Sequence, residues 1–282
     1  MNIRTAALAR TLALAAAALG LHGAAQAALC TISNSGAPLR TVNPKPFQVP
    51  PPSTCRVSGL PGSPSLPGYI LVASRVADIV VSNVKVGNLY DRVYCLGTGS
   101  TCDSTRTYIL ATRLHMLATP VNFPNRNPNC PLWSGTSNDC FEVNNVFRNI
   151  RGNASAPIAA EVGYWMGSSA TSTNPNTALS QKYLEYTGKT YKGLNQISPP
   201  GTAADRDNTR VMFWNDVNTF DPDGDNSPWS PWLYVKQNCP NGVVTANLTT
   251  DPRTRFAIKY WQGGEEGQIQ KNVQAAAYVC VP

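Results

Sequence analysis

The sharpest chemical signal in the sequence is a run of alternating aspartates after residue 220. Asp221, Asp223 and Asp225 flank Gly224, and their carboxylates could hold calcium, which takes about six to eight oxygen ligands. No glutamate closes the run as in an EF-hand loop. Aspartate, proline and glycine are also the ordinary residues of turns. Two hypotheses stay open, a structural calcium site and a turn rich in aspartate.

Two tryptophans follow this run, in the stretch Trp229-Ser230-Pro231-Trp232. Indole rings are flat and apolar with one N–H at the edge, so a pair near a loop can stack on sugar rings. The competing hypothesis is that Trp232 begins a strand and packs in the core, with Trp229 covering it from the loop. Trp229 and Trp232 are therefore the candidate ligand-binding residues.

Histidine limits the catalytic chemistry available to the chain. After the leader segment described below, the sequence has one histidine, His115. Ser-His-Asp and Cys-His mechanisms need a histidine beside the nucleophile, and the Gly-x-Ser-x-Gly elbow is absent. A three-histidine zinc site needs more histidines than this chain offers. The sequence thus favours a non-catalytic protein that requires no cofactor.

A polymer-degrading hydrolase or lyase is the alternative, because glycoside hydrolysis needs only two carboxylates at the right separation. Such pairs are set in space and leave no sequence pattern. The carboxylates available for this chemistry are Glu142, Glu161, Glu185, Asp205, Asp207, Asp216, Glu265 and Glu266.

Eight cysteines point to an oxidising compartment. Their even number in an exported chain is typical of four disulfides, and no Cys-x-x-Cys spacing suggests a metal or redox site. Eight cysteines allow roughly a hundred connectivities, between which sequence cannot decide. Pairing by proximity predicts Cys30–Cys55, Cys95–Cys102, Cys130–Cys140 and Cys239–Cys280.

Residues 1–27 have the pattern of a Sec-type signal peptide. Arg4 and Arg10 begin it, an apolar run follows, and the small residues Ala25 and Ala27 offer a cleavage site. The run is too short and too rich in alanine to span a membrane, which takes about 20 strongly apolar residues. We expect a secreted or periplasmic bacterial protein without a transmembrane segment.

The composition favours a β protein and gives no sign of nucleic-acid binding. Charged residues make up 14% of the chain, whereas Gly numbers 21 and Pro 23, which is typical of turn-rich β proteins. The formal charge of +7 falls to +5 without Arg4 and Arg10. The basic residues are scattered singly, which indicates a solvated surface and not a nucleic-acid stripe.

Alternation of apolar and polar residues predicts about nine strands. Within the strand predicted at 108–116, Leu114 and Met116 share one face while Arg113 and His115 share the other. A break at Gly87 separates the first two strands, and Arg148 falls on the polar side of a later one. The predicted strands cover residues 69–86, 89–96, 108–116, 141–150, 158–166, 210–217, 232–239, 255–261 and 274–281.

These elements predict an all-β, disulfide-braced sandwich or barrel-like fold. We expect residues 1–27 to be the signal peptide, 28–67 a proline-rich arm and 68–282 a single β-rich domain. Proline forbids helices and central strands in the arm. A short helix is expected at 177–186.

The predicted role is binding or structural: an envelope component, an adhesin-like protein or a carbohydrate-binding module, whose partner is a glycan or a component of the cell envelope. Long loops on a rigid β scaffold commonly carry such functions. A third hypothesis is an assembly subunit that self-associates by strand exchange. Residues 274–281 or the arm would then complete the sheet edge of a neighbouring copy.

Overall fold

The structure is a computed structural model, and the part of the chain that it describes is all-β and antiparallel, without a helix. It describes residues 29–31, 57, 59–63, 65–81, 83–117, 141–150, 160–165, 185–191, 206–218, 228–245, 256–262 and 269–281. The strands are β1 (Cys30–Thr31), β2 (Tyr69–Val81), β3 (Val84–Thr98), β4 (Thr101–Cys102), β5 (Thr107–Met116), β6 (Phe141–Asn149), β7 (Glu161–Trp165), β8 (Glu185–Tyr191), β9 (Arg206–Asn218), β10 (Trp232–Asn238), β11 (Val243–Thr245), β12 (Phe256–Gln262), β13 (Ile269–Ala275) and β14 (Tyr278–Cys280).

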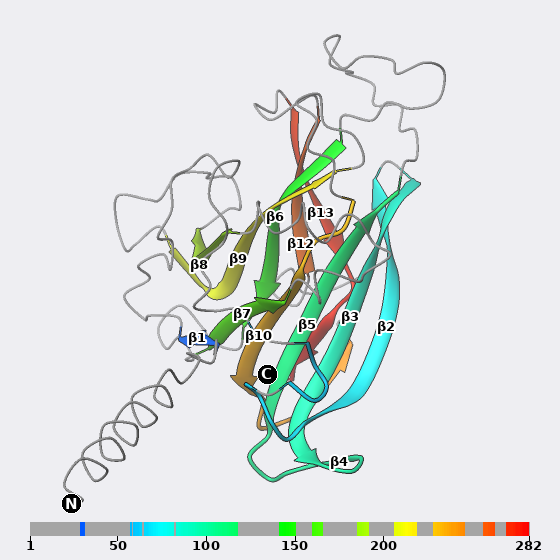
Figure 1. Cartoon of the computed structure of the whole chain (residues 1–282). Helices are drawn as coiled ribbons and strands as arrows, with labels where there is room; N and C mark the ends of the chain where they lie inside the picture. The colour runs from blue at the N-terminus through cyan, green and yellow to red at the C-terminus, as the bar shows by residue number, and fades with distance from the viewer. Residues whose placement is uncertain are drawn as a thin grey trace, which may run out of the picture.

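The largest sheet has seven strands in the order β1-β7-β10-β5-β3-β2, with β4 paired to β3 (Figure 1). A five-stranded sheet has the order β13-β12-β6-β9-β8, and β11 pairs with β14. Strands β10 and β7 come from distant parts of the sequence, yet β10 lies between β5 and β7. The large sheet is therefore complete only when late residues of the chain have joined it.

One apolar cluster joins the two larger sheets. It draws on the inner faces of β2, β3, β5, β7 and β10 and on β6, β9 and β13. Strand alternation explains its membership, because every second side chain of a strand points to the same face. Its fully buried members are Ile79, Leu89, Leu114, Val143, Val146, Val162, Val211, Phe213, Val217, Leu233 and Val235.

The break expected at Gly87 is wrong, since this glycine lies inside β3 and the chain turns near Asn83. Asn83 has a φ of 65°, and asparagine is one of the few residues that tolerates this left-handed region. At Gly87, a Cβ would lie 2.7 Å from the carbonyl oxygen of His115. The glycine thus permits a close approach between β3 and β5.

The interpretation of Arg148 as a residue on a polar strand face is also wrong. Its side chain is 2% exposed, and Asp91 beside it is fully buried. Arg148 Nη1 donates to Asp91 Oδ1 over 2.7 Å, and Nη2 donates to Asp91 Oδ2 over 3.3 Å. Because Arg148 lies on β6 and Asp91 on β3, this ion pair links the two sheets.

Two further groups complete the buried ion pair. Thr112 Oγ1 donates to Asp91 Oδ1 over 3.0 Å and itself accepts from Arg148 Nη1. The Tyr278 N–H donates to Asp91 Oδ2 over 2.6 Å, and the Tyr278 carbonyl accepts from Arg148 Nη2 over 2.8 Å. The network therefore joins β3, β5, β6 and β14 at one point.

A short stretch of the predicted arm packs on the outer face of the large sheet. Val57 and Leu60 belong to a second apolar cluster with Tyr94 and Tyr234, and Leu66 packs against it. The Val57 N–H donates to the carbonyl of β7 residue 164 over 2.8 Å. This stretch therefore covers the part of the outer face around Tyr94 and Tyr234.

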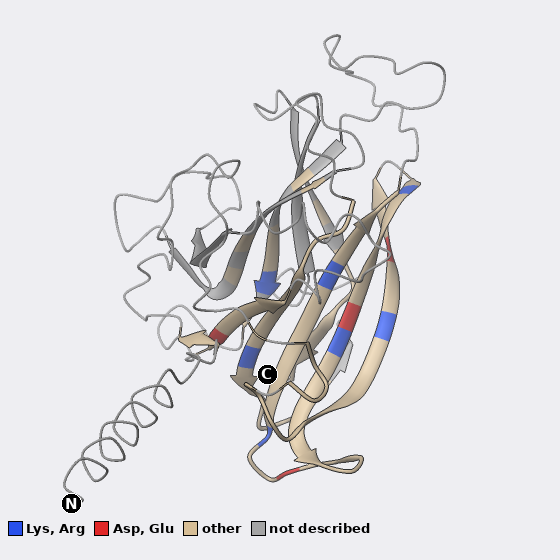
Figure 2. Ribbon diagram, viewed as in Figure 1, with Lys and Arg blue, Asp and Glu red and all other residues tan. Residues whose placement is uncertain are grey.

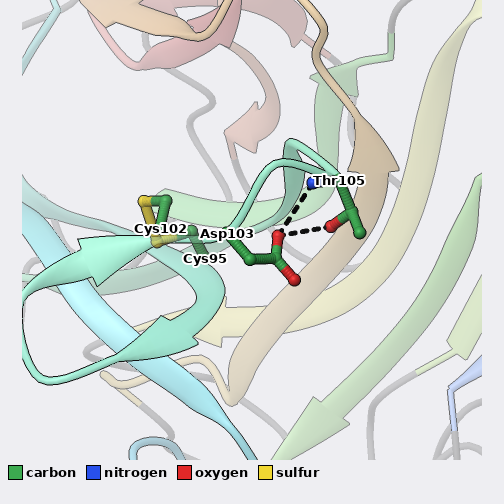
Figure 3. The surroundings of a disulfide bond; sticks show 4 residues. All are labelled: Cys95, Cys102, Asp103 and Thr105. Atoms are coloured by element: carbon green, nitrogen blue, oxygen red, sulfur yellow. Dashed lines mark hydrogen bonds between the residues drawn. A yellow bond between two sulfur atoms is a disulfide. The ribbon is translucent and has the colours of Figure 1, made fainter.

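Two of the predicted disulfides are confirmed. Cys95 and Cys102 join β3 to β4, with Cα atoms 5.6 Å apart, and Asp103 just beyond accepts from the N–H and hydroxyl of Thr105 (Figure 3). Cys239, which follows β10, bonds to Cys280 on β14 with a Cα separation of 5.2 Å. The second bridge connects segments 41 residues apart in sequence.

Several expectations fall outside the described residues. Cys30 is disulfide-bonded, whereas Cys55, Cys130 and Cys140 are not among the described residues. Residues 1–27 and most of the arm at 28–67 also lie outside them. Of the helix expected at 177–186, only residues 185 and 186 are described, and they begin β8, so they are not helical.

Candidate binding face

Backbone pairing with β5 holds Trp229 at the end of the large sheet. Trp229 forms an isolated antiparallel bridge with His115. The Met116 N–H donates to the Pro228 carbonyl over 2.8 Å, and the Ser230 N–H donates to the Leu114 carbonyl over 3.0 Å. These two bonds flank the bridged pair, a position at which opposed side chains of antiparallel strands come closest.

Ser230 fixes the step between this bridge and β10. Its side chain is fully buried, and its hydroxyl accepts from the Leu114 N–H over 2.8 Å and donates to the Pro231 carbonyl over 2.8 Å. The pairing changes register here, because Leu233 lies opposite Thr112 whereas Trp229 lies opposite His115. The serine therefore satisfies a backbone N–H that the register change would leave unpaired.

Trp229 stacks on its neighbours from β3 and β5. The rings of His115 and Trp229 are 3.8 Å apart and inclined by 6°. The guanidinium carbon of Arg113 lies 4.5 Å from the Trp229 ring, within cation–π distance, and Arg113 Nε donates to the Ser230 carbonyl over 2.9 Å. The Tyr90 ring lies 5.5 Å from the indole at a tilt of 34°.

Trp232 has a different position from Trp229. It begins β10, is 7% exposed and belongs to the second apolar cluster. The guanidinium carbon of Arg92 lies 4.5 Å from its ring. The buried Trp232 ring therefore packs against the Arg92 guanidinium, whereas Trp229 is half-buried and more exposed to solvent.

We call the half-buried set Tyr90, Arg92, Arg113, His115 and Trp229 the aromatic–arginine face. Tyr90 and Arg92 lie on the outer side of β3 and Arg113 and His115 on that of β5, with Tyr90 opposite Arg113, and Trp229 packs beside them. Figure 2 shows a red acidic segment directly beside a blue basic segment on β3. The carboxylate next to Arg92 in the sequence is Asp91, which is buried and paired with Arg148, so it does not share the outer face.

The charge on this face comes from its arginines. Burial lowers the pKa of His115, and the positive charge of Arg113 lowers it further, so the imidazole is neutral at pH 7. Burial also lowers the pKa of Arg113, but a guanidinium stays protonated in proteins. Flat aromatic rings beside two guanidinium groups suit a ligand that has an apolar ring face and carboxylate or sulfate groups.

For most of the other predicted site residues, the structure describes no side-chain position. Asp221, Asp223 and Asp225 lie outside the described residues, and no group of three or more metal-ligating side chains occurs within the described ones. Of the carboxylates named for catalysis, Glu161 is engaged with Lys236 at 2.5 Å. The structure describes no side-chain position for the rest of that set.

Sequence reasoning named Trp229 and placed Arg113 and His115 together on one strand face, but it did not single out Tyr90 or Arg92. The available signal was the alternation Tyr90, Arg92 along residues 89–96. Only the pairing of β3 with β5 shows that these residues join the tryptophan.

No family model matches the sequence, and comparison with curated proteins and with solved structures gives no significant match. Within the described residues, no helix has the length and apolar character needed to cross a membrane. The disulfides are compatible with an extracellular or periplasmic location.

Proposed function

We propose that this chain is a secreted or periplasmic, non-catalytic binding protein whose aromatic–arginine face takes an acidic glycan. The observation that carries the proposal is the joint presence of Trp229, Tyr90, Arg92 and Arg113 on one outer sheet face. In this proposal the two sheets form a single disulfide-braced sandwich, and calcium, if bound by Asp221, Asp223 and Asp225, has a structural role.

The physical argument has two parts. The apolar faces of sugar rings pack on aromatic side chains, and guanidinium groups form paired, charge-assisted hydrogen bonds with carboxylates or sulfates. The face is built in advance, because Ser230 and the bridge to His115 hold Trp229 in place. A preformed site loses less conformational entropy on binding than a mobile loop would.

The formal charge of +7, which is +5 without Arg4 and Arg10 of the expected signal peptide, supports the choice of an anionic ligand. A positive surface raises the local concentration of anionic polymers, and this attraction weakens with added salt. We therefore expect binding to an acidic glycan to fall as ionic strength rises, while a neutral glycan binds weakly at every salt concentration.

The test is calorimetric titration of the disulfide-bonded protein with oligogalacturonate as the acidic probe and maltohexaose as the neutral probe. We expect Trp229→Ala to weaken oligogalacturonate binding about tenfold or more, the equivalent of roughly 1.4 kcal/mol. Arg113→Gln should act in the same direction.

The matched control is Arg106→Asn. Arg106 is exposed, precedes β5 at the end far from Trp229, and has a φ of 54° that asparagine tolerates. This variant loses the same charge as Arg113→Gln and should bind like the parent. Equal binding by all three variants, or absence of binding to a panel of carboxylated and sulfated oligosaccharides, would contradict the proposal.

A further inference from the structure

Strand β2 is the outermost strand of the large sheet. It pairs with β3 along one side, and no described strand pairs with its other side. An edge of this kind presents unpaired backbone N–H and C=O groups that another strand can join. At 13 residues, β2 is also long for an edge strand.

Exposed apolar side chains gather on the same strand. Among the described residues, the large hydrophobic side chains that are exposed are Leu71, Val72, Val76 and Val80, with exposed fractions of 43%, 40%, 56% and 46%. All four belong to β2. Single exposed apolar residues are common on protein surfaces, but their confinement to one sheet edge indicates a surface that is covered in the working protein.

The order of residues along β2 is self-complementary. Antiparallel pairing centred on Val76 would place this residue opposite Val76 of a second copy, with Ser74 opposite Asp78. On the opposite face of the sheet, Arg75 would lie opposite Ala77 of the second copy. No like charges are opposed, and the central pair is apolar, which are the conditions that stabilise cross-strand pairs.

The geometry also limits how far such pairing extends. Strand β2 is regular from Ala73 to Ile79, and irregularities between Leu71 and Ala73 and between Ile79 and Val80 flank this span. Bulges of this kind bend an edge away from further partners. The regular centre therefore suits one short antiparallel partner, and a two-fold pair covers both β2 edges at once.

The C-terminal segment, which the sequence suggested for strand exchange, is already paired with other strands of the same chain. Strand β13 pairs with β12, and β14 pairs with β11. Cys280 of β14 is bonded to Cys239. Exchanging this segment into a neighbouring copy would require those pairings to be given up, whereas edge pairing through β2 requires no rearrangement.

We propose that two copies of this chain associate edge to edge through β2, antiparallel and centred on Val76. A two-fold axis perpendicular to the sheet then leaves both outer faces on the same side of one continuous sheet. Both aromatic–arginine faces would point in one direction, so a polymeric ligand could engage them together and bind with avidity. The proposed pairing does not depend on the proposed function, whereas the gain in avidity rests on the proposed function.

The experiment is sedimentation-equilibrium analysis of the disulfide-bonded protein across a concentration series, with Val76→Lys as the disrupting variant. We expect a dimer for the parent and a monomer for Val76→Lys, because two ammonium groups would meet at the axis. Val76 is 56% exposed, so the substitution should leave the fold intact. Thr98→Lys, at an exposed end of β3, is the charge-matched control and should stay dimeric.

The register has a separate test by cross-linking. Val76→Cys should form a cross-linked dimer with a short bismaleimide, whereas Thr98→Cys should not, since residue 98 lies far from the proposed axis. A parent that remains monomeric up to about 1 mM, or a Val76→Lys variant that remains dimeric, would overturn the proposal. Because these readouts involve no glycan, their failure is distinguishable from failure of the proposed function.

Discussion

The buried ion pair between Asp91 and Arg148 allows the sharpest prediction about stability. Both side chains are almost completely enclosed, at 0% and 2% exposure. Removing one partner leaves the other charge buried without compensation, which costs about 3–5 kcal/mol in comparable sites. We expect Asp91→Asn and Arg148→Met each to lower the free energy of unfolding by about that amount.

The double variant is expected to be no less stable than either single variant. When Arg148→Met accompanies Asp91→Asn, no buried charge is left without a partner, and the new carboxamide keeps an oxygen that can accept from the Tyr278 N–H. Arg148 Nε is buried and has no hydrogen-bond partner among the described residues, so its removal also eliminates an unsatisfied donor. Well-packed replacements of buried ion pairs are often neutral.

Urea denaturation of the four proteins forms a double-mutant cycle. The matched control is Glu161→Gln, which removes the partner of Lys236 in a half-buried surface pair and should cost less than about 1 kcal/mol. Single variants of the buried pair that cost under about 1 kcal/mol, or strictly additive effects in the double variant, would refute the reasoning.

Two further predictions concern the disulfides and the histidine. Replacing Cys239 and Cys280 with alanine should lower the free energy of unfolding by about 4 kcal/mol, against about 2 kcal/mol for the Cys95 and Cys102 pair, because the disulfide that closes the longer loop restricts the unfolded chain more. Denaturation of the two double variants measures both losses, and the reverse order would contradict the prediction. His115 should titrate below pH 6.5 in an NMR pH series, since burial lowers its pKa. Between the pKa of His115 in the unfolded chain and its lower pKa in the folded protein, the unfolded state binds more protons, so the free energy of unfolding should fall as the pH drops through this window. His115→Gln should remove this contribution to the pH dependence of stability.

Local pattern was enough to predict much of the strand layout. The strand expected at 108–116 is Thr107–Met116, and the one expected at 232–239 is Trp232–Asn238. Alternation identifies such strands because their inner residues are apolar and their outer ones polar. The two confirmed disulfides were also those that sequence proximity predicts, which works when cysteines close short hairpins or join neighbouring strands.

The failures depend on partners that lie far away in sequence. Nothing near Arg148 shows that Asp91 on another sheet will enclose its charge. Gly87 resembles a turn residue until the His115 carbonyl beside it is known. The aromatic–arginine face likewise requires the pairing of β3 with β5 and the bridge between His115 and Trp229. Spacing along the chain contains none of these contacts.

The docked stretch around Val57 has a consequence for the order in which the chain acquires its structure. Val57 donates to the carbonyl of Tyr164, and Leu60 shares an apolar cluster with Tyr234. Synthesis proceeds from the N-terminus, so this early stretch emerges long before its partners and cannot bury its apolar residues until they arrive. Contacts this distant in sequence form slowly. During biosynthesis the stretch therefore stays undocked until β7 and β10 have been made, and its docking depends on the completed large sheet.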